Sequence, residues 1–212
     1  MRFSTAIVGI LGLLTASSAA AAPFRYVEDR APAIIDPLFT TTMGEARLQE
    51  LVFDGLFTDD RNLKSTPLLA SGIEVSEDRL SAEVTLRSDV RWHDGQPFRA
   101  SDVVFTIEAM QNPATLSPEG ARVAWITSVE ATGPHSVRFT FDRPQPNPAD
   151  RLYFKILPAH VFQGTVVRRN DPFHTRPIGT GPYRIERFET DPHAAAAAAI
   201  LILAACEEED RE

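Results

Sequence analysis

Two pairs of alternating apolar segments most strongly constrain the fold of this chain. In residues 72–87, apolar side chains recur at every second position on both sides of a polar turn. Residues 126–141 repeat the arrangement around the turn dipeptide Gly133-Pro134. A period of two places alternate side chains on opposite faces of a strand, so each pair predicts a β-hairpin. The chain is therefore expected to contain antiparallel sheet.

Two helices are expected beside the hairpins. From Gly44 onward, apolar residues follow steps of three and four, which describe one helical face, and Gly55 is the expected end of this helix. Ser101 has the chemistry of an N-cap, Asp102 favours the positive start of a helix, and Pro113 ends the second helix.

The remaining elements complete a mixed pattern. Residues 24–27 and 183–188 are candidate strands, 152–157 form a short apolar piece, and 158–162 begin a turn or helix. Strands outnumber helices and do not alternate with them strictly. This indicates an α+β arrangement rather than a doubly wound parallel sheet.

Composition excludes several classes of function. An apolar content of 43% is typical of a globular protein, and the net charge of −8 argues against nucleic acid or anionic lipid as a partner. The single cysteine, Cys206, permits neither an internal disulfide nor a cysteine-based metal site. The five histidines lack the helical spacing of metal ligands, so no metal or other cofactor is expected.

Residues 1–21 have the three parts of a secretory signal peptide. Arg2 precedes an apolar stretch, and small residues lead to an expected cleavage after Ala21. An uncleaved membrane anchor is the alternative, but the stretch is shorter than the ~20 residues that span a bilayer. The mature protein is therefore expected to be exported to the periplasm.

Three blocks carry a family resemblance. The first block is Ile-Asp-Pro at 35–37 followed by residues 48–56. The second runs from 73 to 105 and includes Trp-His-Asp-Gly-Gln-Pro-Phe at 92–98. The third is Pro-Ile-Gly-Thr-Gly-Pro-Tyr at 177–183. In order and spacing they resemble the family 5 extracellular solute-binding proteins, the dipeptide, oligopeptide and nickel receptors of ABC importers. The resemblance covers residues 26 to 188.

The resemblance implies a two-lobed cleft protein with a type II periplasmic-binding-protein fold. This chain then represents lobe one with its extra subdomain, and the second lobe is missing. The implied division is 1–21 signal peptide, 22–44 start of lobe one, 45–175 its subdomain, and 176–190 its return strand. Residues 191–212 are an alanine-rich and then acidic tail, interpreted as an aberrant end such as a frameshift produces; a short genuine helix is the alternative.

The resemblance also suggests where a ligand binds. In the family, the loop after the Asp-Pro pair lines the cleft, which assigns ligand contact to Thr41, Thr42 and Met43. Threonine hydroxyls can hydrogen-bond a peptide backbone, and methionine gives adaptable apolar contact. The alternative is a plain surface loop.

Two motifs that suggest catalysis or phosphate binding have stronger structural interpretations. His93 next to Asp94 could act as a base, but Asp94-Gly95 is turn chemistry and Trp92 is a packing residue, so no catalytic residue is assigned. The 179–181 Gly-Thr-Gly sequence precedes a strand instead of a helix, so it lacks the amides that hold phosphate.

The sequence thus predicts an exported receptor that delivers peptides or similar small solutes to the permease of an ABC importer, and no enzyme. The alternative is an exported fragment or interaction module without transport activity, from a frameshifted gene. An unpaired apolar cleft face would then favour association.

Overall fold

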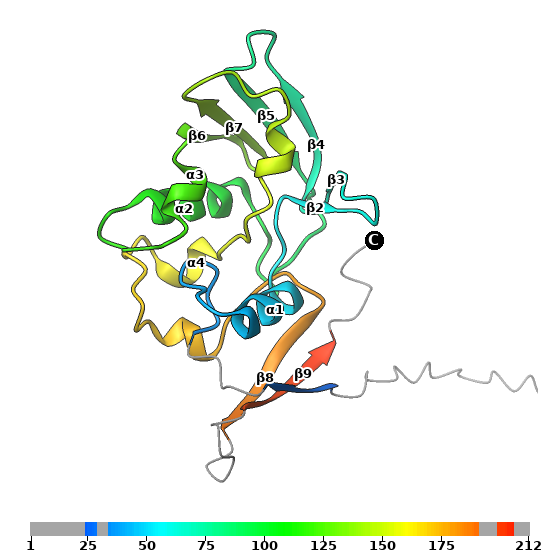
Figure 1. Cartoon of the computed structure of the whole chain (residues 1–212), viewed down its shortest axis with the longest axis vertical. Helices are drawn as coiled ribbons and strands as arrows, with labels where there is room; N and C mark the ends of the chain where they lie inside the picture. Colours follow the sequence, from blue (N-terminus) through cyan, green and yellow to red (C-terminus); the bar gives the residue numbers. More distant parts are fainter. Residues whose placement is uncertain (1–23, 29–33, 191–198, 206–212) are drawn as a thin grey trace, which may run out of the picture.

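The computed structural model describes residues 24–28, 34–190 and 199–205. The predicted signal peptide, 1–21, lies outside these residues, as do 191–198 and 206–212 of the tail. Figure 1 shows a four-stranded sheet at the top, helices beneath it, and a separate three-stranded sheet at the bottom.

The four-stranded sheet consists of the two predicted hairpins joined side by side. Strands β4 (Ala70–Val75) and β5 (Ser81–Leu86) form the first hairpin, and β6 (Ile126–Gly133) and β7 (Ser136–Phe141) form the second. The order is β4-β5-β7-β6, and every neighbouring pair is antiparallel. Both hairpin predictions are confirmed. Buried side chains alternate along the two central strands: Ala82, Val84 and Leu86 on β5, and Val137, Phe139 and Phe141 on β7.

Helix α2 (Ala100–Gln111) packs on the buried face of this sheet and is followed by the short helix α3 (Gly120–Val123). The predicted N-cap was wrong by two positions, because the cap is Arg99 and Ser101 is exposed. The backbone N–H of the N-cap residue is bound by a side chain from the first turn of the same helix. The Asp102 carboxylate accepts a hydrogen bond from the Arg99 backbone N–H at 2.9 Å.

Helix α1 (Met43–Val52) ends before the predicted Gly55, with Phe53 as its C-cap. Gly55 has a different role, since a β-carbon there would lie 2.8 Å from the Tyr153 carbonyl oxygen. It allows residues 53–57 to run against the 153–157 segment, where Gly55 and Lys155 form a β-bridge and the Ile156 N–H donates to the Asp54 carbonyl at 3.0 Å. Thus the apolar piece at 152–157 is a mostly buried irregular segment with a single β-bridge.

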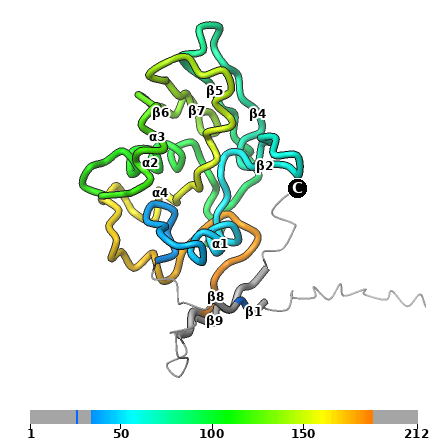
Figure 2. Tube along the Cα trace, viewed as in Figure 1, coloured from blue at the N-terminus to red at the C-terminus, as the bar shows by residue number. Residues whose placement is uncertain are grey.

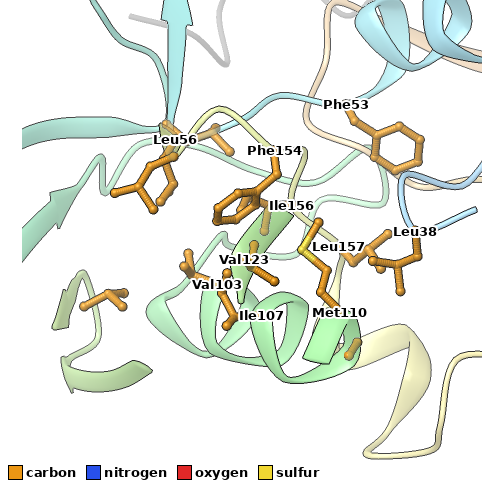
Figure 3. Close-up of a cluster of buried hydrophobic side chains, with 14 of the residues drawn as sticks. Leu38, Phe53, Leu56, Val103, Ile107, Met110, Val123, Phe154, Ile156 and Leu157 are labelled. Carbon is orange, nitrogen blue, oxygen red and sulfur yellow. The ribbon is translucent and has the colours of Figure 1, made fainter. Parts of the chain in front are cut away.

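The core lies where α1, α2 and the 152–157 segment meet. Figure 3 shows Val103, Ile107 and Met110 of α2 facing Phe154, Ile156 and Leu157, with Leu38, Phe53 and Leu56 completing the cluster. The helical spacing of the α2 residues puts them on one face of the helix. Because the cluster draws on four separate stretches of chain, it holds Leu38 and its loop against α2 and the 154–157 segment.

Shorter elements connect these parts. They are β2 (Phe57–Asp59), β3 (Ser65–Pro67), η1 (Pro148–Arg151), α4 (Ala159–Phe162) and η2 (Pro172–Thr175). The longest described helix has 12 residues, and within the described part of the chain none is long and apolar enough to cross a bilayer.

The lower sheet has the order β1-β9-β8. The strands predicted at 24–27 and 183–188 are confirmed as β1 (Phe24–Glu28) and β8 (Tyr183–Thr190). Between them lies β9 (Ala199–Ala205), from the alanine-rich tail, antiparallel to both. The alternative of a helix is therefore wrong for this stretch, which extends a sheet.

Candidate functional site

The predicted ligand loop is built around the start of α1. Thr42 is the N-cap, and its Oγ1 accepts a hydrogen bond from the Glu45 N–H at 3.2 Å. The buried Glu45 carboxylate accepts in return from the Thr42 N–H at 3.0 Å and the Thr41 N–H at 2.8 Å. This reciprocal capping box accounts for both threonines structurally. Met43 has no such role and is 70% exposed.

Thr42→Ala tests the capping role. Because it removes the cap oxygen, we expect a loss of about 1 kcal/mol in the free energy of unfolding, measured by urea denaturation. Thr42→Ser keeps the oxygen and should retain most of the stability. Equal stability of wild type and Thr42→Ala would contradict the capping role.

Beside this loop lies a pocket of about 180 Å³. Thr40 and Pro37 contribute from the loop, whereas Thr41, Thr42 and Met43 do not line it. The other lining residues come from α1, the end of α2, the start of α3 and the 153–155 segment: Ala46, Gln49, Glu50, Met110, Glu119, Arg122, Tyr153, Phe154 and Lys155. The pocket thus lies next to the predicted loop residues, and Pro37 and Thr40, which line it, precede them in the chain.

The pocket carries charges of both signs. Lys155 Nζ lies 2.6 Å from Glu50 Oε2, and the Arg122 guanidinium lies 2.7 Å from Glu119 Oε2. Arg122 also stacks over the half-exposed Tyr153 ring, 4.7 Å from its centroid. Stacking and ion pairing hold the guanidinium at the pocket wall.

A neutral hydrogen-bonding group completes the pocket. The Gln49 amide donates to the Asp36 carbonyl at 3.0 Å and also to Thr40 Oγ1. Sequence reasoning missed Gln49, Arg122, Tyr153 and Lys155, since they lie on separate segments with no common spacing. The 50% exposure of Tyr153 within an otherwise apolar run is visible only in the structure.

The second and third sequence blocks, 86 residues apart, meet at His93. Its N–H donates to the Gly179 carbonyl at 2.9 Å, its Nδ1 accepts from the Gly179 N–H at 3.2 Å, and its Nε2 lies 2.9 Å from the Gly181 carbonyl. The Gly181 N–H donates to the Val52 carbonyl at the C-terminal end of α1. The His93 ring nitrogens are therefore both engaged with the backbone of the 179–181 loop, which is a structural role. That loop lies at the C-terminal end of α1, where carbonyls are exposed, and not at the N-terminal amides that bind phosphate.

Asp94 and Asp36 each pair with a histidine. His160 Nε2 lies 2.7 Å from Asp94 Oδ2 near the surface, where the His160 and Asp94 side chains are 34% and 30% exposed. His174 Nδ1 lies 3.2 Å from Asp36 Oδ2, with both side chains almost fully buried. His193 lies outside the described residues. The buried pair joins residues 36–40, the loop beside the pocket, to η2.

The model of bacterial extracellular solute-binding proteins, family 5 middle, matches residues 64–196. The chain belongs to this family. The predicted family is thereby confirmed. The second and third sequence blocks lie within the matched residues, which extend beyond residue 188, whereas the first block precedes them. Members of the family are solute-binding proteins.

The curated relatives that the chain matches are longer than it is. A putative ABC transporter peptide-binding protein of Brucella ovis is 33% identical over 127 residues, which cover 58% of this chain and 24% of the relative. The chain thus spans about a quarter of the length of such relatives.

Solved family 5 structures share the fold. NikZ of Campylobacter jejuni, in complex with Ni(L-His), has a TM-score of 0.69 and 34% identity, covering 76% of this chain and 34% of NikZ. The oligopeptide-binding protein AppA of Bacillus subtilis, in complex with a nonapeptide, has a TM-score of 0.71 at 24% identity, covering 76% and 33%, and supports the fold alone. The structure is thus a partial lobe of the type II binding-protein fold, as predicted.

Proposed function

We propose that this chain is part of an exported receptor that delivers a peptide or similar small solute to the permease of an ABC importer. The pocket between loop 36–40, α1 and the 153–155 segment forms one wall of its solute site. Family membership supports the receptor role, and the apolar stretch within residues 1–21 supports export to the periplasm. The family's members bind solutes, so no catalytic step is assigned.

The mixed charge of the pocket is the observation that carries this proposal. A peptide presents an ammonium group, a carboxylate and backbone amides, and the wall offers Glu50 and Glu119, Arg122 and Lys155, and Gln49 and Thr40 to match them. We infer that the exposed Met43 offers a solute an adaptable apolar contact, while Thr41 and Thr42 hold the start of α1 through Glu45. Enclosing a solute requires a second wall, so the wall alone should bind weakly.

Trialanine and Ni(L-His) are suitable probes, because the relatives named above include peptide-binding proteins and a protein in complex with Ni(L-His). We expect millimolar binding of one of them, seen as chemical-shift changes in backbone amides at residues 38–50 and 119–123 at about 10 mM probe. Arg122→Gln with Tyr153→Ala should weaken that binding about tenfold, because the pocket loses its fixed cation.

Arg138→Gln is the matched control. Arg138 is likewise paired with a glutamate, Glu83, at 3.0 Å, but it lies on the open face of the four-stranded sheet. Equal weakening in the control would contradict the pocket assignment, as would shifts confined to other residues. Saturable tight binding would show that one wall suffices, and aggregation without any binding would favour the non-transporting alternative.

A further inference from the structure

His174 lies at the point where η2 supports the pocket loop, which we define as residues 36–40. Its Nε2 lies 2.7 Å from the Arg168 carbonyl, and its Nδ1 lies 3.2 Å from Asp36 Oδ2. Neither Nδ1 nor Asp36 Oδ2 has another hydrogen-bonding partner, so the two buried atoms face each other at ion-pair distance without hydrogen-bond alignment. The Phe39 ring meets the imidazole edge-on at 5.6 Å between centroids. Figure 2 shows the blue loop passing close to this yellow-orange segment.

Both ring nitrogens of His174 face acceptors, and only the charged imidazolium has two N–H groups to offer them. A neutral ring would turn one lone pair toward a carboxylate or a carbonyl oxygen. Burial disfavours the charged ring, but Asp36, the Arg168 carbonyl and the charge of Asp171 outweigh burial and raise the pKa of His174 above its ordinary value. The charged side chains that act on the ring are those of Asp36 and Asp171.

Asp36 transmits this state to the pocket loop. Its other oxygen, Oδ1, accepts the Leu38 N–H at 2.7 Å, and its carbonyl accepts the Phe39 N–H at 3.1 Å. The same carbonyl accepts the Gln49 amide of the pocket wall. Two loop residues, Pro37 and Thr40, line the pocket itself. Reorienting Asp36 would therefore change the loop and the wall together.

We propose that His174 is a proton-operated latch for the pocket loop, holding the loop against η2 when the ring is charged and releasing it when the proton is lost. The latch is a property of the fold. Its effect on solute capture rests on the proposed function of the pocket, so the latch itself is tested without solute.

The direction of the effect follows from the sign of the shift. A group whose pKa is raised on folding contributes stability that is fully present below its unfolded pKa, about 6.5 for histidine. That contribution is lost as pH rises through the raised value. The loop should therefore be most firmly held in mildly acidic solution and loosest in alkaline solution.

Two measurements on the full chain test the latch between about pH 6 and about pH 9. Imidazole nitrogen shifts report whether His174 carries both protons, and hydrogen exchange at the Leu38 and Phe39 amides, corrected for base catalysis, reports the loop. We expect both to change together, with exchange accelerating about tenfold as His174 becomes neutral. His174→Gln should exchange quickly throughout, without this pH dependence.

His160→Gln is the control, since it breaks a second histidine–aspartate pair that is closer but partly exposed. It should leave the exchange at Leu38 and Phe39 unchanged. A His174 ring that is neutral over the whole range overturns the proposal, and so does a pH-dependent loop in His174→Gln. If that variant does not fold, the wild-type titration decides alone. Because no solute is used, these results are independent of whether the pocket binds trialanine or Ni(L-His).

Discussion

Alanine in place of Gly179 is expected to destabilise the fold by about 3–5 kcal/mol. A β-carbon at this position would lie 1.7 Å from the Val52 carbonyl oxygen, a contact that requires backbone movement. That movement would pull Gly179 away from His93, with which it shares two hydrogen bonds. The free energy of unfolding can be measured with urea, following the fluorescence of the buried Trp92 and Trp125.

Gly72→Ala is the control for Gly179→Ala. A β-carbon at Gly72 meets nothing within 4 Å, so the unfolding free energy should change by less than about 0.5 kcal/mol. A Gly179→Ala protein as stable as Gly72→Ala would show that the loop does not approach α1 this closely.

Asp102→Ala is expected to lower the free energy of unfolding by about 2–4 kcal/mol. Three donors converge on this buried carboxylate: the Trp92 indole N–H at 3.3 Å, the Arg99 N–H at 2.9 Å and the Ala159 N–H at 2.9 Å. Burial raises the pKa of Asp102, while the two backbone donors and the indole work against that rise. Removing the carboxylate leaves all three donors without an acceptor and uncaps α2.

Thermal unfolding of Asp102→Ala, Asp102→Asn and Asp142→Ala checks this role. Asp102→Asn keeps one acceptor oxygen but turns an amide N–H toward another donor. Its melting temperature should therefore lie between those of wild type and Asp102→Ala. Asp142 is exposed, and its replacement should change the unfolding free energy by less than about 0.5 kcal/mol. Comparable melting temperatures for Asp102→Ala and Asp142→Ala would rule out a structural role for the buried carboxylate.

The elements that could be predicted from the sequence are those that local pattern determines. The β5 and β7 side chains alternate because one face of each strand is buried in the core, and this alternation can be read directly from residues 82–86 and 137–141. Boundaries were predicted less well. Ser101 is a better cap by type than Arg99, but the cap is set by Asp102 reaching back from inside the helix, and Gly55 marks a close approach to Tyr153 instead of a helix end.

The pocket could not be predicted in the same way. Of the Asp-Pro pair and the loop after it, Pro37 and Thr40 line the pocket. Arg122, Tyr153 and Lys155 join that loop only after the 152–157 segment has packed against Gly55. Such long-range packing leaves no periodic signal in the sequence. Ligand contact by Thr41, Thr42 and Met43 stays a prediction.

The order of the four-stranded sheet has a consequence for how the chain folds. Its two hairpins close short loops, and β5 and β7 then join them within one continuous stretch, residues 70–141. Loop-closure entropy rises with the length of chain to be closed, so this stretch can assemble before the more distant contacts form. The docking of Gly179 and Gly181 on His93 and α1 spans far more chain and belongs to a later step. Substitutions at those glycines should therefore mainly speed unfolding, whereas changes in the hairpins should slow folding.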